Sequence, residues 1–127
     1  MSTTIIRKTK VSIGAIEPSM LAIDFDIGIP QGTTARVDVS ADVGFIFPKL
    51  FILTTDPQVE ATVYVQLDGS EVKLFSLDED SSIEVDVDEV YGELQAKRII
   101  LEGKVKTDTT ELRKITLKYS GGIFDFR

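Results

Sequence analysis

Hydrophobic and polar residues alternate with a period of two over Val59–Leu77, the stretch with the clearest pattern in the chain. Apolar residues occupy every second position from Val59 to Leu67, and a second alternating run follows the pair Asp68-Gly69. An Asp-Gly pair between two alternating runs is typical of a β-hairpin with a two-residue type I′ turn. We therefore expect two antiparallel strands joined at this pair.

The register of the hairpin follows from the length of its turn. With a two-residue turn, Val65 faces Val72 and Val63 faces Leu74, so that one face is almost wholly apolar. A three-residue loop would mix apolar and charged side chains on both faces, because a slip of one residue turns every side chain over. The two-residue turn is favoured, with these four residues as the core face.

Similar alternating runs recur along the rest of the chain, separated by turn residues at spacings of roughly 8 to 12 residues. They are Thr3–Ile13, Met20–Gly28, Thr33–Asp42, Val43–Phe47, Lys49–Thr54, Ile83–Val87, Ala96–Lys106, Glu111–Ser120 and Ile123–Arg127. Pro48 is expected to end a strand and Gly121-Gly122 to bend the chain, and Val90–Gln95 is the one helical turn predicted. About ten short strands predict an all-β fold: an antiparallel two-sheet β-sandwich with jelly-roll or Greek-key topology, or a closed barrel.

The chain has 127 residues, which predicts a single domain over 1–127, with residues 1–13 as an N-terminal arm or an edge strand. It contains no apolar run near the roughly 18 residues that a membrane span needs. Its first residues are polar and β-patterned and do not resemble a secretion signal. We therefore expect a protein that is intracellular or is assembled inside a cell.

The absent residue types narrow the chemistry. The sequence has no Cys and no His, which excludes disulfides, thiolate nucleophiles and the commonest general base and transition-metal ligand. The residue inventory therefore favours a protein that is not an enzyme and needs no cofactor. Asn is absent as well, and the joint loss of two thermolabile residue types is a hint of a thermophilic source.

The charge is unevenly distributed. The net charge is −7, which disfavours non-specific binding to nucleic acid or membranes. Residues 61–95 contain ten acids and one base, whereas residues 96–127 contain eight bases and four acids. This asymmetry reflects either solvated faces on different strands or complementary patches that join one copy to the next.

The acidic run Asp78–Glu89 raises the question of calcium. Its oxygen-bearing side chains fall at relative positions 1, 3, 5, 7, 9 and 12, which is the ligand spacing of an EF-hand loop. Position 6, however, is Ile83 where the EF-hand turn needs Gly, and strands rather than helices flank the run. We expect a solvated acidic face, with a looser calcium site at Asp78, Asp80 and Ser82 as the weaker alternative.

Two stretches are candidates for protein contacts. The first is the basic N-terminal segment, through Ile5, Ile6, Arg7, Lys8 and Lys10, lying either on a neighbour or in the protein's own sheet. The second is the outer face of the hairpin, which carries Tyr64, Lys73, Phe75 and Leu77. Because Phe75 and Leu77 make this face half apolar, we expect them to contact a partner subunit.

In general character the chain resembles the small accessory proteins of tailed-phage virions, such as head-decoration or cement proteins, which are short, Cys-free β domains. The nearest local similarity is the segment ITLKYSGG (Ile115–Gly122), which carries over no functional residue. The resemblance implies a structural protein of the virion, assembled in the host cytoplasm, that self-associates as a trimer and stabilises a capsid or similar protein shell. The alternative is a β-sandwich module that binds carbohydrate, through Tyr64, Tyr91 or Tyr119, or calcium.

Overall fold

The computed structural model describes residues 4–11, 19–25, 29–41, 45–78, 81–108 and 110–124. They form nine strands and one short helix: β1 (Thr4–Val11), β2 (Ser19–Phe25), β3 (Thr34–Ala41), β4 (Phe45–Thr55), β5 (Val59–Gln66), β6 (Glu71–Asp78), β7 (Ser81–Asp86), α1 (Val87–Tyr91), β8 (Arg98–Val105) and β9 (Arg113–Phe124). No helix in these ranges is long and apolar enough to cross a membrane.

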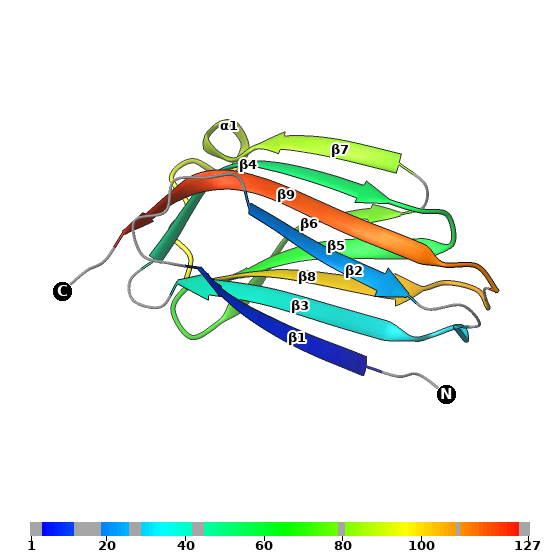
Figure 1. Ribbon diagram of the computed structural model, residues 1–127. Coiled ribbons are helices and arrows are strands. Elements are labelled where there is room, and N and C mark those ends of the chain that lie inside the picture. Colours follow the sequence, from blue (N-terminus) through cyan, green and yellow to red (C-terminus); the bar gives the residue numbers. More distant parts are fainter. Residues whose placement is uncertain are drawn as a thin grey trace.

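The strands form two sheets that face each other (Figure 1). Sheet A has the order β1-β3-β8-β5-β6, and sheet B has the order β2-β9-β4-β7. The antiparallel pairs β2–β9, β3–β8, β4–β7 and β5–β6 nest inside one another, as in a long hairpin rolled into two layers. This is jelly-roll topology, and it confirms the predicted all-β two-sheet sandwich. One pairing, β1 with β3 at the edge of sheet A, is parallel.

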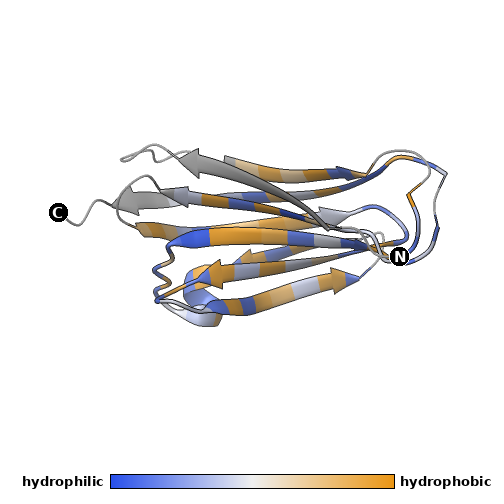
Figure 2. Ribbon diagram, turned by 90° about the horizontal axis from the view of Figure 1, so that it is seen from below, coloured by the Kyte–Doolittle hydropathy of each residue, from blue (hydrophilic) through white to orange (hydrophobic). Residues whose placement is uncertain are grey.

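The core lies between the two sheets and follows from the alternation. Inward-facing side chains from both sheets are almost fully buried, while most of their neighbours along each strand are half-buried or exposed; Asp38, Thr62 and Ile100 of sheet A are buried neighbours. Figure 2 shows this alternation of hydrophobic and hydrophilic residues along the strands. The inward set includes Leu21, Ile23, Phe25, Val37, Val39, Phe51, Leu53, Val63, Val65, Leu101, Ile115 and Leu117. Since burying each such side chain contributes about 1.5 to 3 kcal/mol, this layer holds the two sheets together.

The turn of the β5–β6 hairpin has the predicted two-residue length but is not the predicted type I′, because Gly69 has a positive φ of 80° and Asp68 does not. The amide of Leu67 donates to the carbonyl oxygen of Ser70 at 3.1 Å, and Val65 lies opposite Val72. Val72 nevertheless remains 40% exposed, because β6 is the last strand of sheet A. Its predicted place in the core is therefore wrong.

Farther from the turn, the hairpin departs from the predicted register. Strand β6 carries a β-bulge with Leu74 as the extra residue, so Val63 pairs with Phe75. One extra residue turns the rest of the strand over. Phe75 and Leu77 consequently pack against the core, with the Phe75 ring centroid 5.8 Å from that of Phe51. The predicted outer-face position of Phe75 and Leu77 is therefore wrong.

A second bulge, in β4, helps to explain why the structure has nine strands, fewer than the sequence predicted. Pro48 does not end a strand, because β4 continues past it with Lys49 as an extra residue in the pairing with β9. Gly121 lies opposite Pro48 within β9, and that strand runs on to Phe124 as one element. A Cβ atom on Gly121 would lie 2.2 Å from the carbonyl oxygen of Phe47. This glycine thus permits a close approach of two backbones, where the sequence predicted a bend.

Candidate functional site

The N-terminal segment forms β1 at the edge of sheet A, where Thr4–Val11 pairs residue by residue with Thr34–Ala41 of β3. Of the two predicted arrangements, the structure has the edge strand. The side chains of this segment that were predicted to contact a partner lie outside the described part of the structure, so that role stays a prediction. They are Ile5, Ile6, Arg7, Lys8 and Lys10.

The structure describes two of the three calcium candidates, Asp78 and Ser82, and the predicted site stays a prediction. Asp78 lies on β6 of sheet A, where Lys106 Nζ donates to its Oδ1 at 2.7 Å. Ser82 lies on β7 of sheet B, where its hydroxyl is 3.3 Å from that of Thr54. Asp80 falls outside the described residues, and among those described no group of three or more acidic side chains could hold a metal ion.

The rest of the acidic run belongs to β7 and α1. An extended strand cannot wrap around an ion as an EF-hand loop does, so the EF-hand spacing has no structural counterpart here. Glu84 and Asp86 are exposed on β7, as predicted for a solvated acidic face. Asp86 caps α1 by accepting from the amide of Glu89 at 3.2 Å, and the helix starts three residues before the predicted turn at Val90–Gln95.

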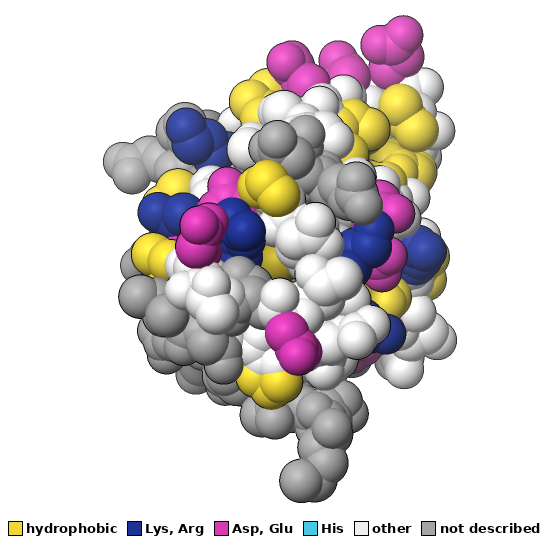
Figure 3. All heavy atoms as spheres, turned by 90° about the vertical axis from the view of Figure 1, so that its right-hand side faces the viewer, with side chains coloured by type: hydrophobic (Ala, Val, Ile, Leu, Met, Phe, Trp, Pro, Cys, Tyr) yellow, Lys and Arg dark blue, Asp and Glu magenta, His cyan; other side chains and the backbone are white. Residues whose placement is uncertain are grey.

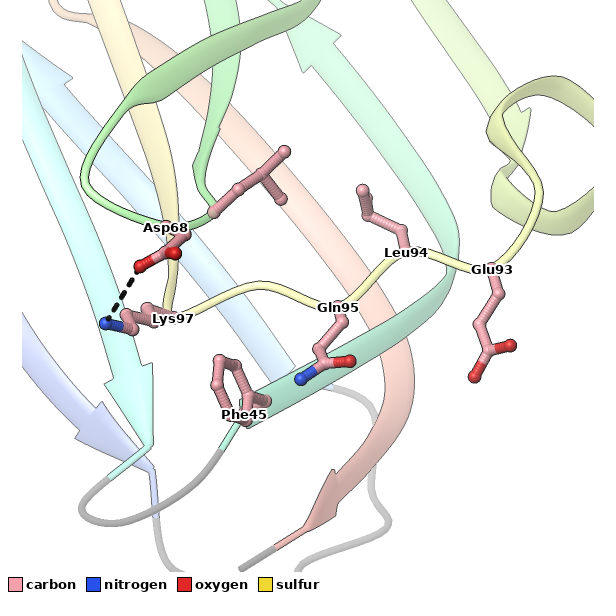
Figure 4. A pocket seen from close by; sticks show the side chains of 7 residues that line it. Phe45, Asp68, Glu93, Leu94, Gln95 and Lys97 are labelled. Carbon is pink, nitrogen blue, oxygen red and sulfur yellow. Dashed lines mark ion pairs between the residues drawn. The ribbon is translucent and has the colours of Figure 1, made fainter. Parts of the chain in front are cut away.

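A pocket of about 500 Å³ opens at the end of the sandwich where the hairpin turn lies (Figure 4). We call it the end pocket. One wall of the pocket is the segment before β8. This segment forms hydrogen bonds with strands of both sheets. Ala96 exchanges backbone hydrogen bonds of 2.7 and 2.9 Å with Ile46 of β4, and the Lys97 amide donates to Gln66 of β5 at 2.7 Å. The lining residues are Phe45, Leu67, Asp68, Glu93, Leu94, Gln95 and Lys97.

The end pocket combines apolar and polar walls. Figure 4 shows the Gln95 amide next to the Phe45 ring, while Leu94, on the same segment as Gln95, points the other way. Lys97 Nζ lies 3.9 Å from the Asp68 carboxylate at the rim. A cavity of this size with an apolar base and a few polar groups suits a small polar molecule. No local sequence pattern indicates this pocket, since its lining comes from the start of β4, the β5–β6 turn and the segment between α1 and β8.

A groove of about 680 Å³ lies along the open side of the sandwich, where β6 and β7 are the last strands of their sheets. We call it the edge groove. The residues lining it are Phe75, Ile83, Glu84, Val85, Asp86, Glu89, Val90 and Tyr91. Val90 on α1 is 60% exposed, so the groove presents apolar surface directly to solvent.

Helix α1 is fixed to the far side of the edge groove through one hydrogen bond. The Tyr91 hydroxyl donates to the carbonyl oxygen of Leu74, the bulged residue of β6, at 2.8 Å. Burial raises the pKa of Tyr91 above its usual value, because an apolar setting disfavours the phenolate. The groove therefore has a rigid apolar wall at the helix.

The rim of the edge groove is acidic. Three of its lining residues, Glu84, Asp86 and Glu89, are acids, and none is a base. The nearby Lys49 pairs with Asp88 at 3.2 Å, a residue that does not line the groove. Figure 3 shows acidic and hydrophobic side chains gathered together at the top of the molecule, at the height of β7 and α1 in Figure 1.

The outer face of sheet B carries three large apolar side chains, Met20, Leu50 and Ile52, around Lys118. Met20 lies opposite Lys118, which lies opposite Ile52, and Leu50 follows on the same face of β4. Met20 is 58% exposed. A shallow depression of about 220 Å³ is lined by Leu50, Ile52, Lys118, Tyr119 and Ser120. We call this surface the sheet B patch.

The sheet B patch was not predicted from the sequence, although a signal was present. Residues 50–53 read Leu-Phe-Ile-Leu without alternation, which indicates a strand that is apolar on both faces. The three tyrosines proposed for carbohydrate binding differ in their exposure to solvent. Tyr119 is only 6% exposed, so it cannot stack on a sugar, whereas Tyr64 and Tyr91 are half-buried.

No protein-family model matches this sequence, and no curated protein sequence matches it. The fold is similar to that of Aeromonas hydrophila PliG, a periplasmic inhibitor of g-type lysozyme, with a TM-score of 0.50 and 12% identity over 94% of this chain and 99% of that chain. The Yersinia pseudotuberculosis-derived mitogen has a TM-score of 0.49 and 9% identity, covering 89% of this chain and 91% of that chain. A chain of infectious bursal disease virus, strain Gx, has a TM-score of 0.30 and 13% identity. The match covers 82% of this chain and 32% of that chain. At such low identity the likeness to PliG is one of fold alone.

Proposed function

We propose that this protein is a non-catalytic structural or assembly protein that works through contacts with other protein subunits. The setting suggested by the sequence resemblance is decoration or cementing of a virion capsid or a similar shell. The observation that carries the proposal is the sheet B patch, where Met20, Leu50 and Ile52 present apolar surface on the outside of a sheet.

Three large apolar side chains lie on an outer face whose other residues are mainly polar, among them Asp24, Lys114, Thr116 and Lys118. Antiparallel sheets with one solvated face normally place polar residues there. Contiguous exposed apolar surface instead marks places where proteins associate. The flanking Lys118 and Glu84 lie in the same row as Ile52 and supply charges of both signs, which would orient a partner at the patch.

The test is the mass of the protein in solution across a concentration series, by sedimentation velocity and native mass spectrometry. The wild type is expected to form a defined oligomer, and Ile52→Glu is expected to shift it to monomer. The matched control is Ser76→Glu, which adds the same charge at an exposed position on the outer face of sheet A. A wild type that stays monomeric throughout, or equal effects of the two substitutions, would overturn self-association through this patch.

A second function, binding of a small carbohydrate, is favoured by the end pocket. Phe45 is half-buried there beside the Gln95 amide, and apolar and hydrogen-bonding groups together are what a sugar ring requires. A ligand that binds the native state alone raises the melting temperature. Thermal melting with a panel of mono- and disaccharides, and separately with calcium, tests this alternative, and Phe45→Ala should abolish any sugar-dependent shift.

A further inference from the structure

We propose that the edge groove is a docking site for an extended segment of a partner protein, in which basic and apolar residues alternate. The segment would add as a strand to the free edge of β7. This proposal does not depend on the function proposed for the sheet B patch, although Glu84 borders both surfaces.

The first argument is the state of the β7 edge. Among the described residues, β7 pairs only with β4, so its other edge has no strand beside it. Edge strands are usually protected by lysine, proline or a bulge. Strand β6 has both a lysine, Lys73, and the bulge at Leu74, whereas Ser81–Asp86 has no lysine or proline, and its six pairs with β4 run without a shift. The backbone of β7 is therefore open to strand addition.

The second argument is the alternation within β7. Ile83 and Val85 point toward the interior side, and Glu84 and Asp86 point to the outer face of sheet B. Side chains of a strand added beside β7 would follow the same two faces, because neighbouring strands in a sheet share their pleat. Its apolar residues would meet Phe75 in the groove, and its outward residues would lie beside Glu84 and Asp86.

The third argument is charge, which selects the occupant. A second copy of β7 would set carboxylates against carboxylates, and like charges placed opposite each other in a sheet are destabilising. A segment with lysine or arginine at alternate positions pairs with the same acids favourably. Strand β7 has six residues and spans about 20 Å, so a segment of about five to seven residues fits it. The exposed Val90 on α1 offers a further apolar contact at one end.

The test uses a blocked heptapeptide of alternating lysine and valine, measured by titration calorimetry and by amide hydrogen exchange of the full-length protein. Two control peptides have the same length: one with the lysines and valines in separate blocks, and one with glutamate in place of lysine. We expect the alternating basic peptide to bind, and to slow exchange at β7 above all. Glu84→Lys should weaken binding at least tenfold. The matched control is Asp24→Lys, an exposed acid on β2, the other edge strand of sheet B.

Several outcomes would overturn the proposal. One is the absence of binding by the alternating peptide. Another is equal binding of the block peptide, or equal loss in Asp24→Lys, either of which would mean attraction by net charge alone. Protection that appears at β7 on raising the protein concentration without peptide would instead assign the groove to a second copy of the chain. Far-ultraviolet circular dichroism of both variants shows that a loss of binding is not a loss of folding.

Discussion

The hydroxyl of Tyr91 donates a hydrogen bond to the carbonyl oxygen of Leu74 at 2.8 Å, and this contact joins α1, which follows sheet B, to the edge of sheet A. Leu74 is the extra residue of the β6 bulge, and a bulge interrupts the ladder of backbone hydrogen bonds. The tyrosine therefore supplies a partner to a carbonyl that the bulge has displaced. It also braces one wall of the edge groove.

Removing this hydroxyl should destabilise the fold. Tyr91→Phe keeps the ring but leaves the Leu74 carbonyl without its donor, and we expect a loss of about 1 kcal/mol in the free energy of unfolding. Urea denaturation followed by circular dichroism measures it. The control is Tyr64→Phe, because Tyr64 is half-buried too but its hydroxyl makes no hydrogen bond that the structure shows. Equal losses in the two variants would contradict the role assigned to the hydrogen bond.

The same hydroxyl should make stability depend on alkaline pH. Because burial raises the pKa of Tyr91, the folded protein holds the phenolic proton more tightly than the unfolded chain. Its contribution is fully present below the unfolded pKa of about 10 and is lost as the pH rises through the folded-state pKa. Unfolding curves at a series of pH values above neutral should show a steeper alkaline loss for the wild type than for Tyr91→Phe. Identical slopes would contradict the prediction.

Below neutral pH, the ion pair of Arg36 and Glu71 should make stability depend on pH as well, by a smaller amount. The hydrogen bond from the Arg36 guanidinium lowers the pKa of the Glu71 carboxyl below its ordinary 4.5. A lowered folded-state pKa stabilises the fold above the unfolded value, and this gain is lost as the pH falls through the folded value. Glu71→Gln should therefore cost up to about 1 kcal/mol at neutral pH, as expected for a partly exposed pair, and progressively less in acid. Glu93→Gln, which removes an exposed acid on a loop, is the control for the loss of one negative charge.

The strands were predictable from the sequence because burial in a sandwich imposes a period of two. The inward positions of β2, β3, β8 and β9 follow that period closely, as Ile23, Val37, Leu101 and Leu117 show. The two-residue length of the Asp-Gly turn was predictable for a local reason, since glycine accepts the positive φ that a tight hairpin turn needs. Gly69 indeed has a positive φ of 80°.

The bulges were not predictable from the alternation, because distant contacts decide them. An extra residue at Leu74 allows Phe75 to pack against Phe51 of the opposite sheet, a contact that no local pattern encodes. The edge groove was missed for the same reason. Its acids were recognised in the sequence, but the bulge brings Phe75 to them, and the jelly-roll topology leaves β7 at an edge.

The ion pair of Asp38 and Arg98 should contribute more to the free energy of unfolding than a pair on the surface does. Asp38 is 4% exposed, and its Oδ2 lies 3.5 Å from Arg98 Nη1, while its Oδ1 has no hydrogen-bond partner in the structure. Arg98→Leu removes the cation and leaves a buried carboxylate, which should cost about 1 to 3 kcal/mol of unfolding free energy. The double variant Asp38→Asn, Arg98→Leu should recover part of this loss, because the buried charge is then gone. A double variant less stable than Arg98→Leu alone would contradict the argument.

The two glycines at positions 103 and 121 should differ in their tolerance of alanine, although both sit inside strands. At Gly121 the new methyl group would meet backbone atoms of β4, namely the Phe47 carbonyl oxygen at 2.2 Å and the Pro48 Cα at 2.8 Å. Backbone paired in a sheet cannot move aside without breaking hydrogen bonds, so Gly121→Ala should cost at least about 2 kcal/mol. At Gly103 the nearest atom is the side-chain tip of Ile115, at 2.4 Å, which can change rotamer.

Gly103→Ala should therefore be the milder substitution, costing about 1 kcal/mol through repacking of the core. Chemical denaturation of both variants gives the comparison directly. Amide exchange adds a spatial readout: Gly121→Ala should speed exchange in β4 and β9 around the bulge, whereas Gly103→Ala should leave those amides protected. If Gly121→Ala were the better tolerated of the two, β4 and β9 could not approach as closely as the structure places them. The bulge at Lys49 would then have lost its explanation.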